Sequence, residues 1–476
     1  MLVVISDLHF SDETAGTFNL SYESFGSVFV NDILSLARTK QAHEIRLLIL
    51  GDLVDLLITR QWLDEPLENR PWGARGLQDS KGYRPEVHGE SPVEARSLQI
   101  LNAIYEANRE TFDFFKHEFR QVVKDELGIP VHIYYVPGNH DRMVNTYPKV
   151  RDRLQELFGF NIEDHKQVDA YGEWWYQYEY TAENYGVFAR HGHQFDLVNF
   201  NGGTDFSLQG ERKTALGDVL TTEFFVKIID LFIREKEQNE LFRDELVEYI
   251  KYITDIRPIQ RTAHWLNERI QNEPDPQLQE LLQQIKNEAV DNLITVPFVR
   301  EWVEEYVKKN NQLMYWLHKV AYPICGYGLM KRIVRFIVHN MTLGKIIEMI
   351  NKSDGQEGTV HDTYVRSAYG EPAWKNNPRI QYVLYGHTHS PLQSALEKRD
   401  NREVLYINTG TWRPRLYMTV DSKFVRVNQV TFAVFYDKHE DVWNEEAGDV
   451  NFEWWNGNHK RVMPKLPSKV ASKLPS

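Results

Sequence analysis

The amino-acid sequence predicts an α/β fold in which a core of mixed β-sheet is interrupted by a large helical insertion. Short apolar runs rich in β-branched residues recur near both ends of the chain, and helical patterns separate them. Between about residues 205 and 350, strand signals vanish and long segments with helical spacing take over. Because 476 residues exceed the usual size of a single hydrophobic core, we expect one large domain with insertions or two domains.

The expected strands are short and lie on both sides of the helical insertion. In chain order they cover the opening residues up to Ser6, then 45–50, 131–136, a hairpin of 175–180 with 187–189, and finally 382–385, 404–407 and 431–436. The alternating aromatic residues of the hairpin indicate antiparallel pairing, so the sheet should be mixed rather than purely parallel.

Helices are expected to connect these strands. They cover about 24–40, then 91–128 with a possible break, and 149–158. Ser91 and Glu94 form the pattern of a capping box, with a proline at the first helical position between them. Residues 60–91 are rich in Gly, Pro, Arg and Trp and are too long for a plain connection, which suggests a lid on the substrate side.

These patterns divide the chain into three parts. A discontinuous core covers 1–204 and 351–436, the helical insertion covers 205–350, and a polar C-terminal tail covers 437–476. The formal net charge of -13 argues against broad adhesion to nucleic acid, which depends on basic side chains. A single cysteine, Cys325, excludes intrachain disulfides and indicates a reducing compartment. With no recognisable signal peptide and no apolar run long enough to span a bilayer, a cytoplasmic protein is expected.

Potential metal ligands follow directly behind five of the apolar runs. The five blocks are Asp7-Leu8-His9, Gly51-Asp52-Leu53-Val54-Asp55, Gly138-Asn139-His140-Asp141, His191-Gly192-His193 and Gly386-His387-Thr388-His389. The carboxyl ends of strands are where α/β folds place their ligands. The sequence therefore predicts that these separated blocks converge on one pocket.

The residue types suit a pair of cations. A dinuclear site for phosphate ester cleavage needs two metals about 3.5–4 Å apart and a ligand that bridges them. Asp52 is the natural bridge, because its carboxylate offers two oxygens and a compensating charge. Asp7 and His9 suit one metal, and Asn139 and His191 suit the other. The spacing of His387 and His389 allows one imidazole to reach each metal.

In this order, the five blocks resemble the calcineurin-like metallophosphoesterase superfamily, whose pattern is D-x-H, G-D-x-x-D, G-N-H-D/E, H-G-H and G-H-x-H. The resemblance covers residues 1 to about 200 and about 380 to 412. It implies a four-layer α/β/β/α sandwich of two mixed sheets flanked by helices. The helical insertion at 205–350 lies outside the resemblance and is expected to form a cap.

The resemblance also implies a role for each candidate residue. The first metal would take Asp7, His9, Asp52 and His389, and the second would take Asp52, Asn139, His191 and His387. His140 would be the catalytic histidine that assists the leaving oxygen, and Asp55 would be the carboxylate that orients it. His193 and Asp141 would support the ligands or contact substrate.

Within the superfamily the chain is partly similar to enzymes of the UDP-2,3-diacylglucosamine pyrophosphatase type. Those enzymes generally carry an arginine where this chain has His140, and their helical cap is smaller. The departure favours a phosphomonoesterase or phosphodiesterase that uses a histidine acid.

The resulting functional hypothesis is a hydrolase that cleaves a phosphoester or pyrophosphate bond through a metal-bridging hydroxide. Manganese is the expected metal, with iron or zinc as alternatives. The substrate would carry phosphate and could be linked to a nucleotide or a lipid. A nuclease, a serine/threonine protein phosphatase and a non-catalytic metal-binding scaffold are the competing hypotheses. Stable nucleic-acid binding is not expected, and the sequence leaves the oligomeric state open.

Overall fold

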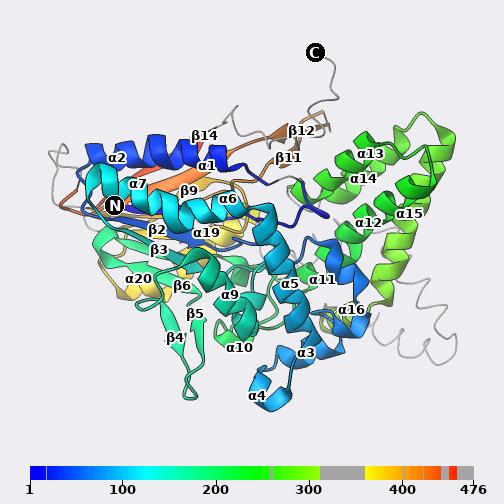
Figure 1. Cartoon of the computed structure of the whole chain (residues 1–476), viewed down its shortest axis with the longest axis horizontal. Helices are drawn as coiled ribbons and strands as arrows, with labels where there is room; N and C mark the ends of the chain where they lie inside the picture. Colours follow the sequence, from blue (N-terminus) through cyan, green and yellow to red (C-terminus); the bar gives the residue numbers. More distant parts are fainter. Residues whose placement is uncertain are drawn as a thin grey trace.

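The computed structural model has an α/β architecture in which helices surround two mixed β-sheets (Figure 1). The structure describes residues 1–17, 19–257, 261–310, 360–399, 402–421, 423–440 and 450–457. The end of the predicted insertion, residues 311–350, therefore lies outside the described residues.

The first sheet contains five strands in the order β14-β13-β1-β2-β3. Their bounds are β1 Leu2–Ile5, β2 Ile45–Leu50, β3 Val131–Val136, β13 Val430–Tyr436 and β14 Asn451–Gly457. The three N-terminal strands are parallel to one another, and β13 pairs antiparallel with both β1 and β14. The sheet is therefore mixed, as predicted.

The second sheet also contains five strands, in the order β6-β7-β8-β10-β9. Their bounds are β6 Glu179–Ala182, β7 Val187–Arg190, β8 Tyr382–Tyr385, β9 Leu392–Arg399 and β10 Arg402–Asn408. Strands β7, β8 and β10 are parallel, whereas β6 and β9 are antiparallel edge strands. The predicted hairpin is confirmed as β6 and β7, although its first strand begins at Glu179 rather than at Trp175.

Period-two alternation along the strands gives each sheet two apolar faces. In β2, Leu48 and Leu50 pack in a cluster with Val187 and Leu384 of the second sheet, while Leu47 and its alternating neighbours face the helices. Buried strands with two covered faces are expected to be apolar throughout. The core therefore lies partly between the two sheets and partly beneath the helices.

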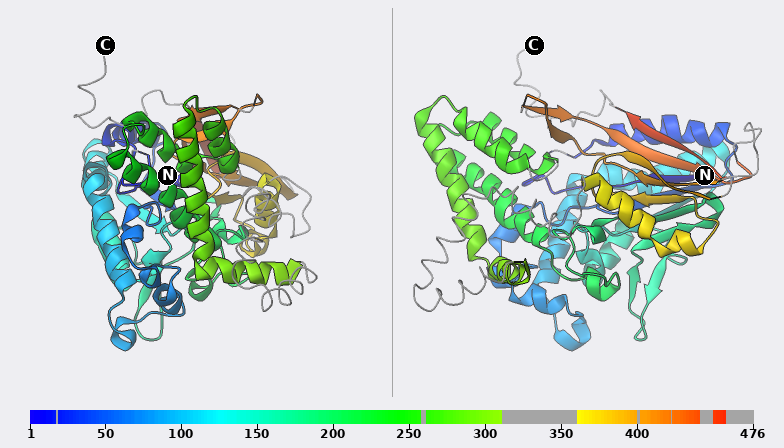
Figure 2. Two further views of the ribbon diagram at one scale, coloured as in Figure 1. Left: turned by 90° about the vertical axis from the view of Figure 1, so that its right-hand side faces the viewer. Right: turned by 180° about the vertical axis from the view of Figure 1, so that it is seen from behind.

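Helices cover the outer face of each sheet. On the first sheet lie α1 Tyr22–Gly26, η1 Ser27–Ile33, α2 Leu34–Thr39, α5 Pro92–Ala107, α6 Arg109–Asp113, η4 Phe114–Glu118, α7 Phe119–Leu127 and α9 Pro148–Phe158. On the second lie α19 Val360–Gly370 and α20 Pro372–Asn376. Figure 2 shows these last two helices on the side of the molecule opposite α2 and α7. The helix predicted at 24–40 is thus present as α1, η1 and α2, and the one at 91–128 is interrupted as expected.

Residues 205–310 form a predominantly helical segment to one side of the sheets (Figures 1 and 2). Its members are α10 Leu208–Glu211, α11 Leu216–Leu220, η7 Thr221–Val226, α12 Lys227–Gln238, α13 Asp244–Ile250, η8 Lys251–Asp255, α14 Thr262–Gln271, α15 Pro276–Thr295 and α16 Pro297–Asn310. Pro276 and Pro297 start their helices, because proline at the first position needs no backbone donor. Ile256 forms a parallel bridge with Leu416 of β11 Arg415–Met418, which ties this segment to the core.

Three local expectations were wrong. Residues 60–91 are not an open loop but contain η2 Arg60–Asp64, η3 Leu67–Asn69, α3 Ala74–Asp79 and α4 Pro85–His88, with Trp62 and Trp72 buried. Ser91 caps α5 at Val93 N, but Glu94 accepts from Lys149 N at 3.0 Å and so supports α9 rather than closing a capping box. The segment 437–476, expected to be a polar tail, contributes β14 to the edge of the first sheet.

The short strands β4 Lys166–Val168, β11 and β12 Phe424–Val427 were not predicted, and β5 Trp174–Tyr176 overlaps the start of the strand predicted at 175–180. They form small two-stranded ribbons outside the main sheets. Within the described residues, no helix combines the length and the apolar character needed to cross a membrane.

Replacing Phe25 by alanine should destabilise the fold by about 3–5 kcal/mol, because the vacated volume in a packed core cannot fully close. The Phe25 ring stacks on Trp412 at 4.8 Å, and the Trp412 indole N–H donates to the Thr431 carbonyl at 2.8 Å. Urea unfolding followed by circular dichroism measures the change. The control is Val87→Ala, whose side chain is 72% exposed and should leave stability within about 0.5 kcal/mol. Equal stability of the two variants would contradict this packing.

Candidate metal centre

The predicted ligands meet where parallel strands of the two sheets end. Asp7 and His9 follow β1, Asp52 follows β2, and the Asp7 and His9 amides donate to the carbonyls of Gly51 and Asp52. From the second sheet, His387 follows β8, and its amide donates to both carboxylate oxygens of Asp7 at 3.1 Å. The pocket is therefore assembled across the junction of the two sheets.

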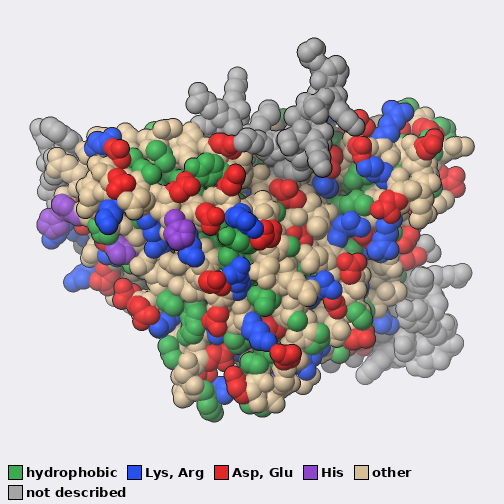
Figure 3. All heavy atoms as spheres, viewed as in Figure 1, with side chains coloured by type: hydrophobic (Ala, Val, Ile, Leu, Met, Phe, Trp, Pro, Cys, Tyr) green, Lys and Arg blue, Asp and Glu red, His purple; other side chains and the backbone are tan. Residues whose placement is uncertain are grey.

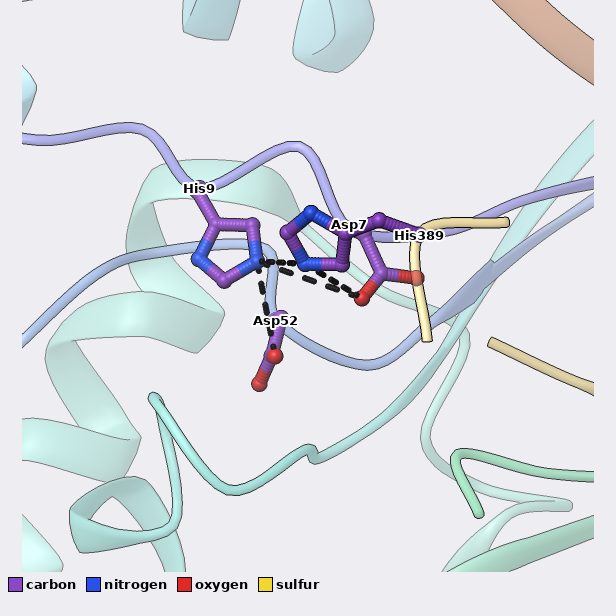
Figure 4. Close-up of side chains that lie close together, drawn as sticks. All are labelled: Asp7, His9, Asp52 and His389. Atoms are coloured by element: carbon purple, nitrogen blue, oxygen red, sulfur yellow. Dashed lines mark hydrogen bonds and ion pairs between the residues drawn. The ribbon is translucent and has the colours of Figure 1, made fainter. Parts of the chain in front are cut away.

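One group of four side chains contains Asp7, His9, Asp52 and His389, all buried (Figure 4). One ligand atom from each lies within 4.8 Å of all the others. The Nε2 atoms of His9 and His389 are 3.0 Å apart, and His389 Nε2 is 3.3 Å from Asp7 Oδ1. Two imidazole nitrogens facing each other beside two carboxylates form a donor set that suits a divalent cation.

A second group contains Asp52, His191 and His387. His191 Nε2 lies 3.2 Å from Asp52 Oδ2, and His387 Nδ1 lies 3.0 Å from the Asn139 amide oxygen. His191 Nε2 is buried and faces the Asp52 carboxylate, so a cation held by Asp52 would find this nitrogen within reach. Asp52 belongs to both groups, which is the position that a bridging carboxylate must occupy.

The second nitrogen of three of these rings is held by a fixed acceptor. His9 Nδ1 is 3.0 Å from Asp55 Oδ2, His191 Nδ1 is 2.9 Å from the Leu50 carbonyl, and His387 Nε2 is 3.1 Å from an Asp196 oxygen. Such partners set the tautomer and the orientation of metal-binding histidines. Each ring therefore presents its remaining nitrogen to the pocket.

The backbone of the pocket is strained. Seven non-glycine residues among those described have positive φ, and five of them are predicted ligands: Asp7, His9, Asp52, His387 and His389. The left-handed region is costly for residues with a Cβ, and such strain gathers at functional sites. The ligand backbones are therefore held in conformations that the local sequence does not favour.

Glycines beside the ligands make room for them. A Cβ on Gly51, whose φ is +83°, would lie 2.1 Å from His191 Nδ1. A Cβ on Gly138 would lie 2.2 Å from Asp52 Oδ1, and one on Gly386 would lie 2.6 Å from Asp7 Oδ2. These three glycines, which begin three of the sequence blocks, are therefore required because a neighbouring side chain occupies the space that a Cβ would fill.

His140 and Asp55 lie next to the first group. Asp55 Oδ2 is 3.1 Å from His140 Nδ1, and Asp55 Oδ1 accepts from the Leu57 and Ile58 amides at 3.1 and 2.7 Å. The Asp55 carboxylate is therefore fixed by backbone donors while it holds both His140 and His9. Unlike Asp55, the His140 side chain is partly exposed, at 14%.

Burial and neighbouring charges shift the pKa values of His9, His140 and Asp52 in different directions. Burial lowers the pKa of His9 to about 4. Burial also disfavours charged His140, but the carboxylates of Asp55 and Asp52 outweigh it and raise the pKa of His140 to about 9. Against burial, the charges of His191 and His140 hold the pKa of Asp52 well below its ordinary value. In the metal-free protein His140 thus carries a proton at neutral pH.

The remaining predicted residues have supporting positions. His193 Nε2 is 2.8 Å from an oxygen of Glu211, which lies in α10, and its ring is 5.4 Å from that of His191. Asp141 accepts from the Leu53 amide at 2.7 Å and from the Gly138 amide, so it joins two ligand-bearing loops. Neither side chain falls within the groups that can hold a cation.

Several supporting residues were not singled out from the sequence. Thr411 donates to the Asp7 carbonyl at 2.7 Å, and Arg413 donates to the His9 carbonyl at 3.0 Å. Arg415 donates to the His389 carbonyl. The available signal was the small-residue run Asn408-Thr409-Gly410-Thr411, which contains Thr411 and precedes Arg413 and Arg415. Asp196 ends the run His191-Gly192-His193-Gln194-Phe195-Asp196, but the sequence alone assigned it no role.

No protein-family model matches the chain, and no curated protein matches it. The fold and the pocket together define an α/β protein with buried His and Asp groups close enough to hold a metal ion.

Replacing Gly51 by alanine should displace His191 and weaken metal binding by about 10–100-fold, as loss of a ligand's orientation does elsewhere. Gly128→Ala is the matched control, because its φ of +70° imposes similar strain while a Cβ there meets nothing within 4 Å. Manganese bound per chain, measured by mass spectrometry after equilibrium dialysis, gives the affinity. Equal metal content in the two variants would contradict the assigned role of Gly51.

Metal binding should strengthen as pH rises from 6 to 8, because protons and cations compete for the same atoms. Burial lowers the pKa of His191, but the charge of Asp52 outweighs burial and raises it to about 10, so His191 must lose a proton when a cation binds. Calorimetric titration with Mn²⁺ in buffers of different ionisation enthalpy measures the protons released. A pH-independent affinity without proton release would contradict this arrangement.

Proposed function

We propose that the protein is a dinuclear metal-dependent phosphohydrolase of the calcineurin-like type, with two divalent cations as cofactors. The observation that carries the proposal is the position of Asp52 in both ligand groups, between Asp7, His9 and His389 on one side and His191 and His387 on the other. A shared carboxylate flanked by two donor sets is what a two-metal phosphoesterase needs.

The donor set favours cations of intermediate hardness. Asp7 and Asp52 supply oxygens, Asn139 supplies a neutral amide oxygen, and imidazoles supply the rest, a mixture that suits manganese, iron or zinc. When bound, two such cations would supply an activated water and offset the charge of the phosphoryl oxygens. The buried Nε2 of His191, which faces the Asp52 carboxylate at 3.2 Å, supports this assignment.

In the proposed reaction, His140 holds the proton that the leaving oxygen takes. Asp55 keeps the imidazole in place through Nδ1, which leaves Nε2 as the atom that can donate. In the metal-free protein the carboxylates of Asp55 and Asp52 outweigh burial and raise the pKa of His140 to about 9. Of these two, Asp55 is not among the proposed metal ligands and remains available to stabilise the protonated ring. Partial exposure of His140 suits a group that must reach a bound substrate.

The arrangement of layers supports the calcineurin-like assignment. Two mixed sheets pack through one apolar cluster, and helices cover each outer face. The helical segment at 205–310 would act as the cap that limits the substrate. Its bridge between Ile256 and Leu416 lies one residue from Arg415, which contacts the His389 carbonyl.

Nucleic acid is not the substrate that we propose. On the face drawn in Figure 3, Lys and Arg side chains are interspersed with Asp and Glu, so the described residues there form no continuous basic track. The formal net charge of -13 also opposes binding to a phosphate backbone. A phosphomonoester or a small diester or pyrophosphate fits this balance better.

A substrate panel tests the proposal directly. Phosphomonoesters, phosphodiesters, nucleotide pyrophosphates, lipid-linked phosphates and a phosphopeptide are assayed with Mn²⁺ and with EDTA. We expect turnover of at least one class with Mn²⁺, loss of that turnover with EDTA, and loss of both metal and turnover in Asp52→Ala. Absence of turnover across the whole panel by a metal-loaded protein would reject the function.

Replacing His140 by asparagine should lower kcat by about 10²–10⁴-fold while metal content stays at the parent level, because only the proton donor is removed. The loss should be smaller for a nitrophenyl ester, whose leaving group needs little protonation, than for an alkyl ester. His132→Asn is a suitable control, since the partly exposed His132 side chain lies near Glu44 rather than in the pocket. A His140→Asn enzyme with the parent rate on the alkyl ester would refute the acid role.

A further inference from the structure

Arg257 lies where the helical segment meets the metal pocket. It follows η8, and the preceding residue, Ile256, pairs with Leu416 in a parallel bridge. The Arg257 amide donates to the Leu416 carbonyl at 3.1 Å, which fixes the backbone at this point. The position of Arg257 is thus set by the core strand β11 as well as by its own helix.

The surrounding contacts place this junction against the ligand loops. Asp255 lies 3.3 Å from Arg413, whose other nitrogen donates to the His9 carbonyl at 3.0 Å. On the other side of the bridge, Arg415 donates to the His389 carbonyl. The backbone at Arg257 is therefore linked, through Asp255 and Leu416, to two arginines that each contact the backbone of a residue of the first group.

The three arginines differ in how their donors are used. Arg413 bonds Thr17 and Asp255 besides His9, and Arg415 bonds Gln429 besides His389. Arg257 donates from Nη1 alone, to the Thr254 and Ile256 carbonyls at 3.1 and 2.9 Å. Among the described residues its Nε and Nη2 have no hydrogen-bond partner and it forms no ion pair, and the side chain is partly exposed.

Three carboxylates attract the Arg257 guanidinium. Burial lowers the pKa of Arg257, against the attraction of Asp255, Asp7 and Asp52. Asp7 and Asp52 belong to the first ligand group, so the guanidinium lies within electrostatic range of that group.

We propose that Arg257 binds a non-bridging oxygen of the substrate's phosphoryl group, through the guanidinium edge that has no partner among the described residues. The proposal rests on the proposed function. Two divalent cations bring four positive charges, and the carboxylates of Asp7 and Asp52 offset two of them. The centre would then carry a net positive charge, which repels the Arg257 guanidinium. A bound anion between the cations and the guanidinium would offset this repulsion.

The helical segment thereby contributes a specificity-determining group and not only a cover. A phosphoryl group with two charged non-bridging oxygens gains more from this contact than a diester with one shared charge. Arg257 would accordingly favour monoesters and terminal phosphates over diesters.

Binding of inorganic phosphate to the manganese-loaded full chain tests the proposal without any requirement for turnover. Arg257→Gln should weaken phosphate binding at least tenfold in calorimetric titration, with manganese content unchanged. Arg257→Lys keeps the charge but lacks the planar donor edge, so its affinity should fall between those of the parent and Arg257→Gln. Arg261→Gln is the matched control, because it removes an exposed arginine of the same segment and should change the affinity less than twofold.

The possible outcomes separate this proposal from the proposed function. Parent affinity in Arg257→Gln, or failure of the metal-loaded parent to bind millimolar phosphate, would overturn the role of Arg257. If Arg257→Gln does not fold, unchanged phosphate affinity in Arg257→Lys overturns it equally. Phosphate binding that depends on Arg257 in a protein that hydrolyses nothing in the substrate panel would instead reject the phosphohydrolase while keeping Arg257 as an anion-binding residue.

Discussion

The burial of the Asp52 carboxylate is the constraint on which the pocket depends. Removing a charged carboxylate from water costs several kcal/mol unless partners compensate for it. Asp52 Oδ1 accepts from the His140 amide at 2.9 Å, and Oδ2 lies 3.2 Å from His191 and 3.5 Å from His9. These partners follow β3, β7 and β1, so the charge is compensated only when both sheets are in place. Assembly of the fold and assembly of the site are therefore the same event.

Several residues that line this pocket have a strained backbone, and neighbouring residues must hold them in that conformation. A residue with a Cβ in a sparsely populated region of φ and ψ costs about 1–3 kcal/mol, and such residues persist only when the surroundings over-determine them. Thr411 holds the Asp7 carbonyl, Arg413 holds that of His9, and Arg415 holds that of His389. The stretch between β10 and β11 thus stabilises the ligand loops from behind, although it offers no ligand itself.

Strands with strongly apolar sequences and the polar residues at their ends could be predicted from the sequence, whereas polar edge strands and long-range contacts could not. Strands at 45–50, 131–136 and 382–385 are covered on both faces, so their sequences are apolar apart from Arg46 and His132. Edge strands such as β9 and β14 carry polar or charged residues and give no such signal. Glu94 follows the local pattern of a capping box, but a contact with the Lys149 amide replaces it. Arg257 has no local pattern, since its position follows from pairing with Leu416.

The helical segment lies beside the metal pocket because it is inserted in the connection between β7 and β8. Strands β7 and β8 are parallel neighbours, and a parallel connection must return from the carboxyl end of the first strand to the start of the second. A connection of a dozen residues or more would suffice, yet this one runs from 191 to 381. Helices α19 and α20 pack on the outer face of the second sheet and complete the crossover. The added helices therefore leave the core directly after His191, at the end of the sheet where the ligands lie. An insertion at this point can place residues such as Arg257 beside the pocket without altering any strand that leads into it.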